Sequence, residues 1–219
     1  KASRGLGDVY KRQFIISIFG MNVSHALLEI EINEGVESAM PIAILSVQSD
    51  GLEQAALLES VVYSNLYRIG MFSLLDKKQH PQTEVMASTI DYDVWRNMSI
   101  EGLISMRLSE QVDDQLKLEI ELFDLVHKRR AMGRFIVFRK LALRIVAHKI
   151  SDVIFEQFTG KPGAFSTRIA YISETLTSQQ QKNYQLLIAD SDGYNPRAVY
   201  SSSKQLMSPA WSPDGQQLA

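Results

Sequence analysis

The pattern of apolar residues changes near residue 160, and this change constrains the fold more than any other feature. From Lys140 to Phe158 the apolar residues recur at helical spacing. After Lys161-Pro162-Gly163 that spacing is lost, and short strand-like runs alternate with turns about every 8–16 residues, as in all-β modules. We therefore predict a mixed domain over residues 27–160, a linker over 161–166 and an all-β module over 167–219.

The first part has the pattern of an α/β domain, a mixed sheet with helices. The run Ile42–Val47 is almost entirely apolar, which predicts a strand covered on both faces. Residues Leu116–Leu122 alternate between apolar and charged, which predicts an antiparallel strand with one face exposed to solvent. The remaining predicted elements are strands at Leu28–Ile32, Phe72–Leu75, Ile100–Leu108 and Phe135–Phe138, and helices at Leu52–Ile69, Asp91–Asn97 and Lys140–Phe158. Ser49 or Asp50 is expected to cap the first helix, Gly70 to end it, and Asp91 to cap the second.

The second part resembles the start of a β-propeller. Three short strands are predicted, at Arg168–Ile172, Tyr184–Ala189 and Ala198–Tyr200. Trp211 then precedes a Pro213-Asp214-Gly215 turn and the start of another strand, the repeating unit of propeller blades. We expect one blade and the start of a second in a propeller that the chain does not complete, although an ordinary hairpin has the same local pattern. Trp95 and Trp211 are expected to be core anchors.

The N-terminus has the pattern of a signal peptide. Lys11-Arg12 precede an apolar run from Phe14 to Val23, and Ser24-His25-Ala26 provide small residues for cleavage after Ala26. This run spans only about 15 Å as a helix, too short for a bilayer core of about 30 Å. We predict that residues 1–26 direct export and are removed, although a buried core segment is the alternative. Residues 1–13 also resemble translated adapter sequence and are assigned no fold.

Composition excludes several classes of function. The chain has no cysteine, so a disulfide framework and a thiolate metal site are impossible. Without residues 1–26 it has 19 basic and 24 acidic residues and a net charge of −5, which disfavours nucleic-acid binding. We predict no metal site and no cofactor, because the four histidines lack metal-ligand spacing and Asp190–Gly193 is better explained as a turn than as a calcium loop.

An enzyme is also disfavoured. The chain contains neither a G-x-S-x-G elbow nor an H-E-x-x-H motif. His148, Ser151 and Asp152 can be drawn as a triad, but their spacing on one helix is more typical of a surface face. We therefore expect no catalytic residues.

Several colinear stretches resemble the TolB family, the periplasmic component of the Tol-Pal system. They are Glu29–Leu45, Gly70–Phe72 with Leu75-Asp76, His148 with Ser151-Asp152, Phe155-Glu156 and Phe158–Gly160, Lys161–Phe165 with Thr167–Tyr171, Asp192–Asn195, and Leu206–Gly215. The resemblance covers residues 28–219 and is most specific at the helix-to-propeller junction. Residues 76–98 and 109–134 match poorly beyond their strand pattern.

The resemblance implies a six-bladed propeller, a periplasmic location without a membrane span, and no enzymatic activity. It also implies roles in outer-membrane integrity and in constriction at cell division. In this family the N-terminal segment binds TolA and the propeller binds the lipoprotein Pal. The matching segment here is Glu29, Ile30, Glu31, Ile32, Asn33, Glu34, Gly35 and Val36.

The residues of that segment leave two interpretations open. An acidic, alternating segment behind a cleavage site can add to the edge of a partner's sheet, with Ile30 and Ile32 filling pockets. Alternatively, the segment pairs with a strand of its own domain. The residues alone favour this second interpretation, whereas the resemblance to the TolB family favours partner binding. For the whole chain, the main alternative is the N-terminal part of an exported prolyl-oligopeptidase-type peptidase, and a generic exported propeller scaffold is a third interpretation.

Overall fold

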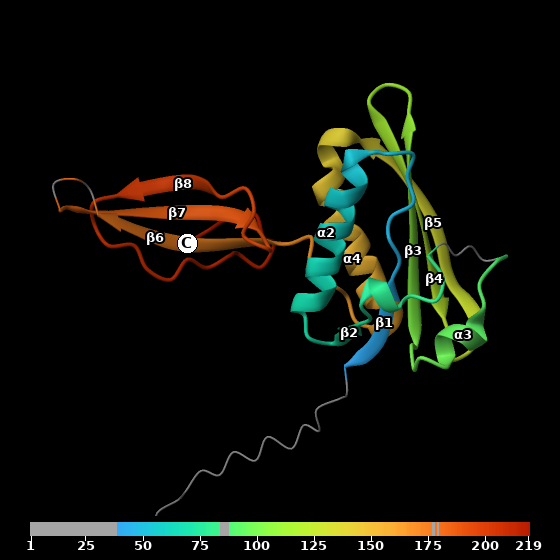
Figure 1. Cartoon of the computed structure of the whole chain (residues 1–219). Helices are drawn as coiled ribbons and strands as arrows, with labels where there is room; N and C mark the ends of the chain where they lie inside the picture. The colour runs from blue at the N-terminus through green and yellow to red at the C-terminus, as the bar shows by residue number, and fades with distance from the viewer. Residues whose placement is uncertain (1–38, 84–87, 177, 179) are drawn as a thin grey trace, which may run out of the picture. The chain divides into compact units, whose positions relative to one another are not determined.

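The computed structural model describes residues 39–83, 88–176, 178 and 180–219 (Figure 1). The predicted signal peptide, the strand at Leu28–Ile32 and the partner segment lie outside these residues. The described elements are β1 (Met40–Ile44), α2 (Glu53–Arg68), β2 (Phe72–Leu74), η1 (Lys77–Gln79), α3 (Tyr92–Arg96), β3 (Gly102–Gln111), β4 (Gln115–Asp124), β5 (Arg129–Arg139), η2 (Lys140–Ala142), α4 (Leu143–Thr159), β6 (Arg168–Leu176), β7 (Lys182–Asp190) and β8 (Arg197–Ser202).

The first sheet has the strand order β2-β1-β3-β4-β5. β1 runs parallel to both of its neighbours, with Ile42 opposite Leu74 on one side and Gly102 on the other. β3, β4 and β5 form an antiparallel meander joined by short turns. The residues from Ile42 to Leu45 are all buried, which confirms the prediction of a strand covered on both faces.

Helices α2 and α4 lie side by side on one face of this sheet (Figure 1). Together with residues of β1, β3, β4 and β5 they form one apolar core, to which α2 contributes Leu58, Val62 and Leu66 and α4 contributes Leu143, Val146, Ile150 and Ile154. The helical spacing therefore identified both helices and most of their buried residues. Gly70 follows α2 at a φ of 72°, as predicted for a helix end.

Two details of α2 differ from the prediction. The helix begins after Leu52, whose side chain makes no cap hydrogen bond, because Gly51 and Leu52 separate Ser49 and Asp50 from the first helical amide groups. The helix ends at Arg68, and Ile69 is exposed because it follows the last helical residue.

The opposite face of the sheet is covered by a smaller cluster around Trp95, which is 0 % exposed. Trp95 lies on α3, which Asp91 caps by accepting hydrogen bonds from the amides of Asp93 and Val94 at 3.1 and 3.2 Å. The indole Nε1 donates to Gln82 Oε1 at 2.9 Å. The predicted cap and the core role of Trp95 are both confirmed.

The second sheet is antiparallel, in the order β6-β7-β8, and its strands contain the three predicted for this part. After it, Trp211 pairs with Leu218 in an isolated bridge, and the Pro213-Asp214-Gly215 turn closes a hairpin through Gly215 N–H and the Ser212 carbonyl, 2.8 Å apart. The prediction that Trp211 is a core anchor is wrong for this structure. Its ring is half-buried, because it lies in a short hairpin with the Arg168 guanidinium over it at 6.0 Å.

In the part of the chain that the structure describes, no helix combines the length and apolar composition that crossing a membrane requires.

Ile150 provides a test of the α4 packing. Its side chain is 8 % exposed in the core between α4 and the sheet. We expect Ile150→Asp to lower the free energy of unfolding by about 3–5 kcal/mol, because it buries an unpaired charge. That is a large part of the roughly 5–15 kcal/mol typical of a domain. Thermal unfolding followed by circular dichroism measures the change. Ile145→Asp, at a position 57 % exposed on the same helix, is the matched control and should change stability by no more than about 0.5 kcal/mol. Equal losses in both variants would contradict this packing.

Candidate functional site at the junction of helix α4 and the second sheet

The predicted partner segment, residues 29–36, lies outside the described residues, so its role stays a prediction. The described chain begins at Ala39 and enters β1 at once, with Met40 N–H donating to the Met71 carbonyl at 2.9 Å. The segment is therefore connected, through only a few residues, to the buried strand β1, which lies between β2 and β3.

A cluster of polar side chains is buried between α2 and α4. Asn65, His148 and Ser151 are all buried. Asn65 Nδ2 lies 3.0 Å from His148 Nδ1 and donates to Ser151 Oγ at 2.9 Å. Ser151 in turn donates to the carbonyl of Ala147 at 2.9 Å, and Arg68 Nη2 donates to Asn65 Oδ1 at 2.8 Å. These bonds pair Asn65, Ser151 and His148 Nδ1 in a place where an unpaired polar group costs free energy, whereas the buried His148 Nε2 has no hydrogen-bond partner.

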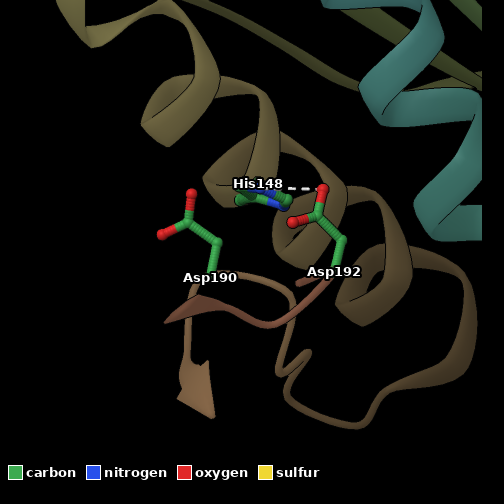
Figure 2. Close-up of side chains that lie close together, drawn as sticks. All are labelled: His148, Asp190 and Asp192. Atoms are coloured by element: carbon green, nitrogen blue, oxygen red, sulfur yellow. Dashed lines mark ion pairs between the residues drawn. The ribbon is translucent and has the colours of Figure 1, made fainter. Parts of the chain in front are cut away.

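The turn that follows β7 packs against this cluster from the second sheet. Figure 2 shows Asp190 and Asp192 on the two sides of His148, with His148 Nε2 3.7 Å from Asp192 Oδ2. Arg144, one helical turn before His148, pairs with Asp192 and lies 3.8 Å from Asp190. The same guanidinium stacks 3.9 Å from the centre of the Tyr194 ring. Two carboxylates of the second sheet thus bind one face of α4.

The charges around His148 nearly balance. Burial is the largest influence and lowers the pKa of the imidazole below its ordinary value of 6.5. Asp192 and Asp190 raise this pKa, whereas Arg144 and Arg68 lower it. The net lowering means that His148 is neutral at neutral pH.

A second connection joins α4 to the residues that follow it. The Asp152 carboxylate accepts hydrogen bonds from the amides of Phe165 and Ser166 at 2.6 and 3.1 Å. Phe165 packs edge-on against Phe155, with ring centres 5.9 Å apart. A Cβ atom at Gly163 would lie 2.6 Å from Asp152 Cα, so only glycine allows the chain to pass this close. The predicted linker is therefore held against the helix.

This arrangement corrects the interpretation of His148, Ser151 and Asp152 as a surface face. His148 and Ser151 are buried, because α2 packs on that side of α4 and Asn65 supplies their partner. The contacts also do not form a catalytic triad. The Ser151 proton is directed to a backbone carbonyl, and His148 Nδ1 bonds to Asn65 rather than to Ser151.

The structure brings together a group that spacing along the sequence did not reveal. One ligand-type atom from each of His148, Asp190 and Asp192 lies within 4.8 Å of the others, although 42 or more positions separate the histidine from the aspartates. The Asp-x-Asp pattern directly after a strand was the available signal. It did not identify the histidine as a neighbour, because only the tertiary fold brings α4 to that turn.

Comparisons with known proteins agree along the chain. Residues 28–131 match the model of the TolB amino-terminal domain, and residues 155–219 match that of the TolB beta propeller domain. Tol-Pal system protein TolB of Thioalkalivibrio sulfidiphilus is 37 % identical over 198 residues, which cover 90 % of this chain and 45 % of that protein. The Hamiltonella defensa protein of the same name is 35 % identical over 212 residues, covering 96 % of this chain and 49 % of that protein.

A solved structure agrees with the sequence matches. The crystal structure of TolB from Acinetobacter baumannii superposes with a TM-score of 0.71 at 29 % identity, covering 82 % of this chain and 43 % of that one. The chain spans about half the length of the curated relatives it matches. Because TolB matches lie on both sides of the junction, the peptidase alternative is not favoured, and the chain belongs to the TolB family of Tol-Pal system proteins.

Proposed function

We propose that this protein is a periplasmic component of the Tol-Pal system that acts by binding partner proteins, with no catalytic activity. It supports outer-membrane integrity and outer-membrane constriction during division. Its family membership and the signal-peptide pattern of residues 14–26 support this proposal. In this proposal, residues 27–160 form the N-terminal domain, 161–166 the connection, and 167–219 the first blade and the start of the second of a six-bladed propeller.

The N-terminal segment, residues 29–36, is proposed to bind the C-terminal domain of TolA. The sequence of this segment is the observation that supports TolA binding. Glu29, Glu31 and Glu34 supply negative charge without any positive charge, and Ile30 and Ile32 project from the same face of an extended chain. A strand of this kind adds to a sheet edge by backbone hydrogen bonds, while its apolar side chains fill pockets and its acids favour a basic partner.

The propeller is proposed to bind the lipoprotein Pal, mainly through blades outside this chain. The first blade supplies a sheet with exposed apolar residues, among them Ile169, Val199 and Tyr200, on which neighbouring elements can pack. The N-terminal domain and the propeller would then bind different partners, and the contacts at Arg144 and Asp152 connect the two.

Deletion of residues 27–35 tests the TolA proposal. We expect the deletion to abolish binding of the TolA C-terminal domain and to leave the melting temperature unchanged, because the described fold begins after the deleted residues. Isothermal titration calorimetry measures the affinity. A variant with residues 27–35 in scrambled order keeps the charge but not the alternation, and should also bind poorly. Unchanged affinity after the deletion would refute the role of this segment.

Single substitutions separate pocket filling from charge. Ile30→Asp and Ile32→Asp should each weaken TolA binding about 10- to 100-fold, because each loses the burial of an isoleucine worth roughly 1.5–3 kcal/mol. Glu31→Gln should change the association rate and its dependence on salt more than the dissociation rate. Surface plasmon resonance at two salt concentrations measures both rates. If the isoleucine variants bind like the unmodified chain while Glu31→Gln does not, attraction between charges alone explains the binding.

A further inference from the structure

The strand β5 forms one edge of the first sheet, and its outer side is unpaired in the part of the chain that the structure describes (Figure 1). β4 pairs with its inner side from Arg129 to Arg139. The other edge strand, β2, has only 3 residues, whereas β5 has 11. Backbone N–H and C=O groups along the free side of an edge strand can pair with a further strand. β5 is therefore the long free edge of this sheet.

A β-bulge limits the part of β5 that another strand can follow. Arg130 and Met132 lie opposite consecutive residues of β4, so Ala131 between them is the extra residue. Bulges of this kind discourage pairing at a sheet edge. From Met132 to Arg139 the register with β4 is unbroken. We call residues 132–139 the regular edge of β5.

Two large apolar side chains on the regular edge are exposed to solvent. Phe135 is 69 % exposed and Val137 is 46 % exposed. Because they are two residues apart, they share one face of β5, and the other face carries Met132 and Phe138, which are buried in the core with the helices. An edge strand that is only protected against aggregation carries charged residues at such positions. The exposed pair is instead typical of a surface that a partner covers.

β5 is also strongly basic, although the whole chain has a net charge of −2. The strand contains four arginines and no acidic residue. Arg129 and Arg130, before or at the bulge, pair with acids of β4. Arg134 and Arg139, on the regular edge, are exposed and form no ion pair or hydrogen bond with any residue that the structure describes. Two free guanidinium groups thus stand on either side of the exposed phenylalanine and valine in the sequence.

We propose that the regular edge of β5 binds an extended, acidic segment of a partner protein as an added strand of the first sheet. Backbone hydrogen bonds to the free edge supply affinity. Apolar side chains of the added strand pack on Phe135 and Val137, and acidic side chains at the alternate positions pair with Arg134 on the other face. A further acid pairs with Arg139. The partner's segment therefore alternates acidic and apolar residues over about six positions.

The charges of β5 disfavour a second copy of the same strand as the occupant. Pairing of two copies along this edge brings the arginines of one strand close to those of the other, and like charges across a strand pair are destabilising. Residues 29–36 of the chain itself are acidic and alternating, so they are the competing occupant. The site is separate from the proposed TolA-binding segment, and either proposal can fail while the other holds.

Titration of the full chain with a designed peptide tests the proposal. The probe is a peptide of about nine residues that alternates glutamate and valine, and its control has lysine in place of glutamate. We expect the glutamate peptide to shift the amide resonances of residues 132–139 and to slow their hydrogen exchange, with an affinity that falls as the salt concentration rises. The lysine peptide should not bind. Absence of binding by the glutamate peptide at about 1 mM, or equal binding of both peptides, would overturn the proposal.

Substitutions on β5 show where the peptide binds. Arg134→Glu reverses one free charge and Phe135→Ser removes the exposed ring, so each should weaken binding of the glutamate peptide about fivefold or more. Arg129→Glu makes the same charge reversal before the bulge and should change the affinity less than about twofold. All three side chains are exposed, so the melting temperature should change little. If Arg129→Glu weakens binding as much as Arg134→Glu, general attraction between charges explains the binding and the proposal fails.

Deletion of residues 27–35 separates a partner from the chain's own N-terminal segment. The deletion should leave peptide binding at β5 unchanged, whatever its effect on TolA binding. A contrary result has two parts: the intact chain protects the amides of residues 132–139 from exchange without peptide, and the deletion makes this edge available to the peptide. In that case the chain's own segment is the occupant, and the proposal of a partner is overturned.

Discussion

The burial of β1 on both faces is the constraint on which the rest of the first domain depends. Ile42 and Ile44 contribute to the core under α2 and α4, whereas Ala43 and Leu45 contribute to the cluster around Trp95. A strand that lies between two parallel neighbours and is shielded from solvent on both faces requires a covering layer on each side of the sheet. The helix pair supplies one layer, and the short α3 with its loop supplies the other.

This constraint bears on how a bound partner would act on the domain. The proposed TolA-binding segment leads into β1, the strand whose burial holds both layers together. β1 lies between β2 and β3 in the sheet and follows the proposed segment after residues 37–39.

The seam between α2 and α4 has a different physical character from the apolar core around it. Buried polar groups are tolerated when each one has a partner, and Asn65, Ser151 and His148 Nδ1 meet that condition together, whereas His148 Nε2 has no hydrogen-bond partner. The same residues face the second sheet through Asp192, and Arg144 and Asp152 add two further contacts from α4. One helix thus belongs to the core of the first domain and also binds the start of the propeller.

Within the described residues, the sequence by itself determined the α-helices and most of the strands, their order and the change from α/β to all-β structure near residue 160. Local patterns suffice for this, because a helix or a strand buries its own periodic stripe of apolar residues, as Leu58, Val62 and Leu66 do in α2. The cap at Asp91 and the end of α2 at Gly70 were likewise predictable, since they depend on neighbouring backbone groups.

Which residues meet across the chain was decided only by the tertiary structure. The spacing of His148 on its helix predicted a surface residue, but His148 is buried. Trp211 was predicted to be a core anchor, but it is only half-buried. The reason is that burial depends on which element packs against a side chain, and residues as distant as Asn65, His148 and Asp192 become neighbours only after the helices and the blade have come together.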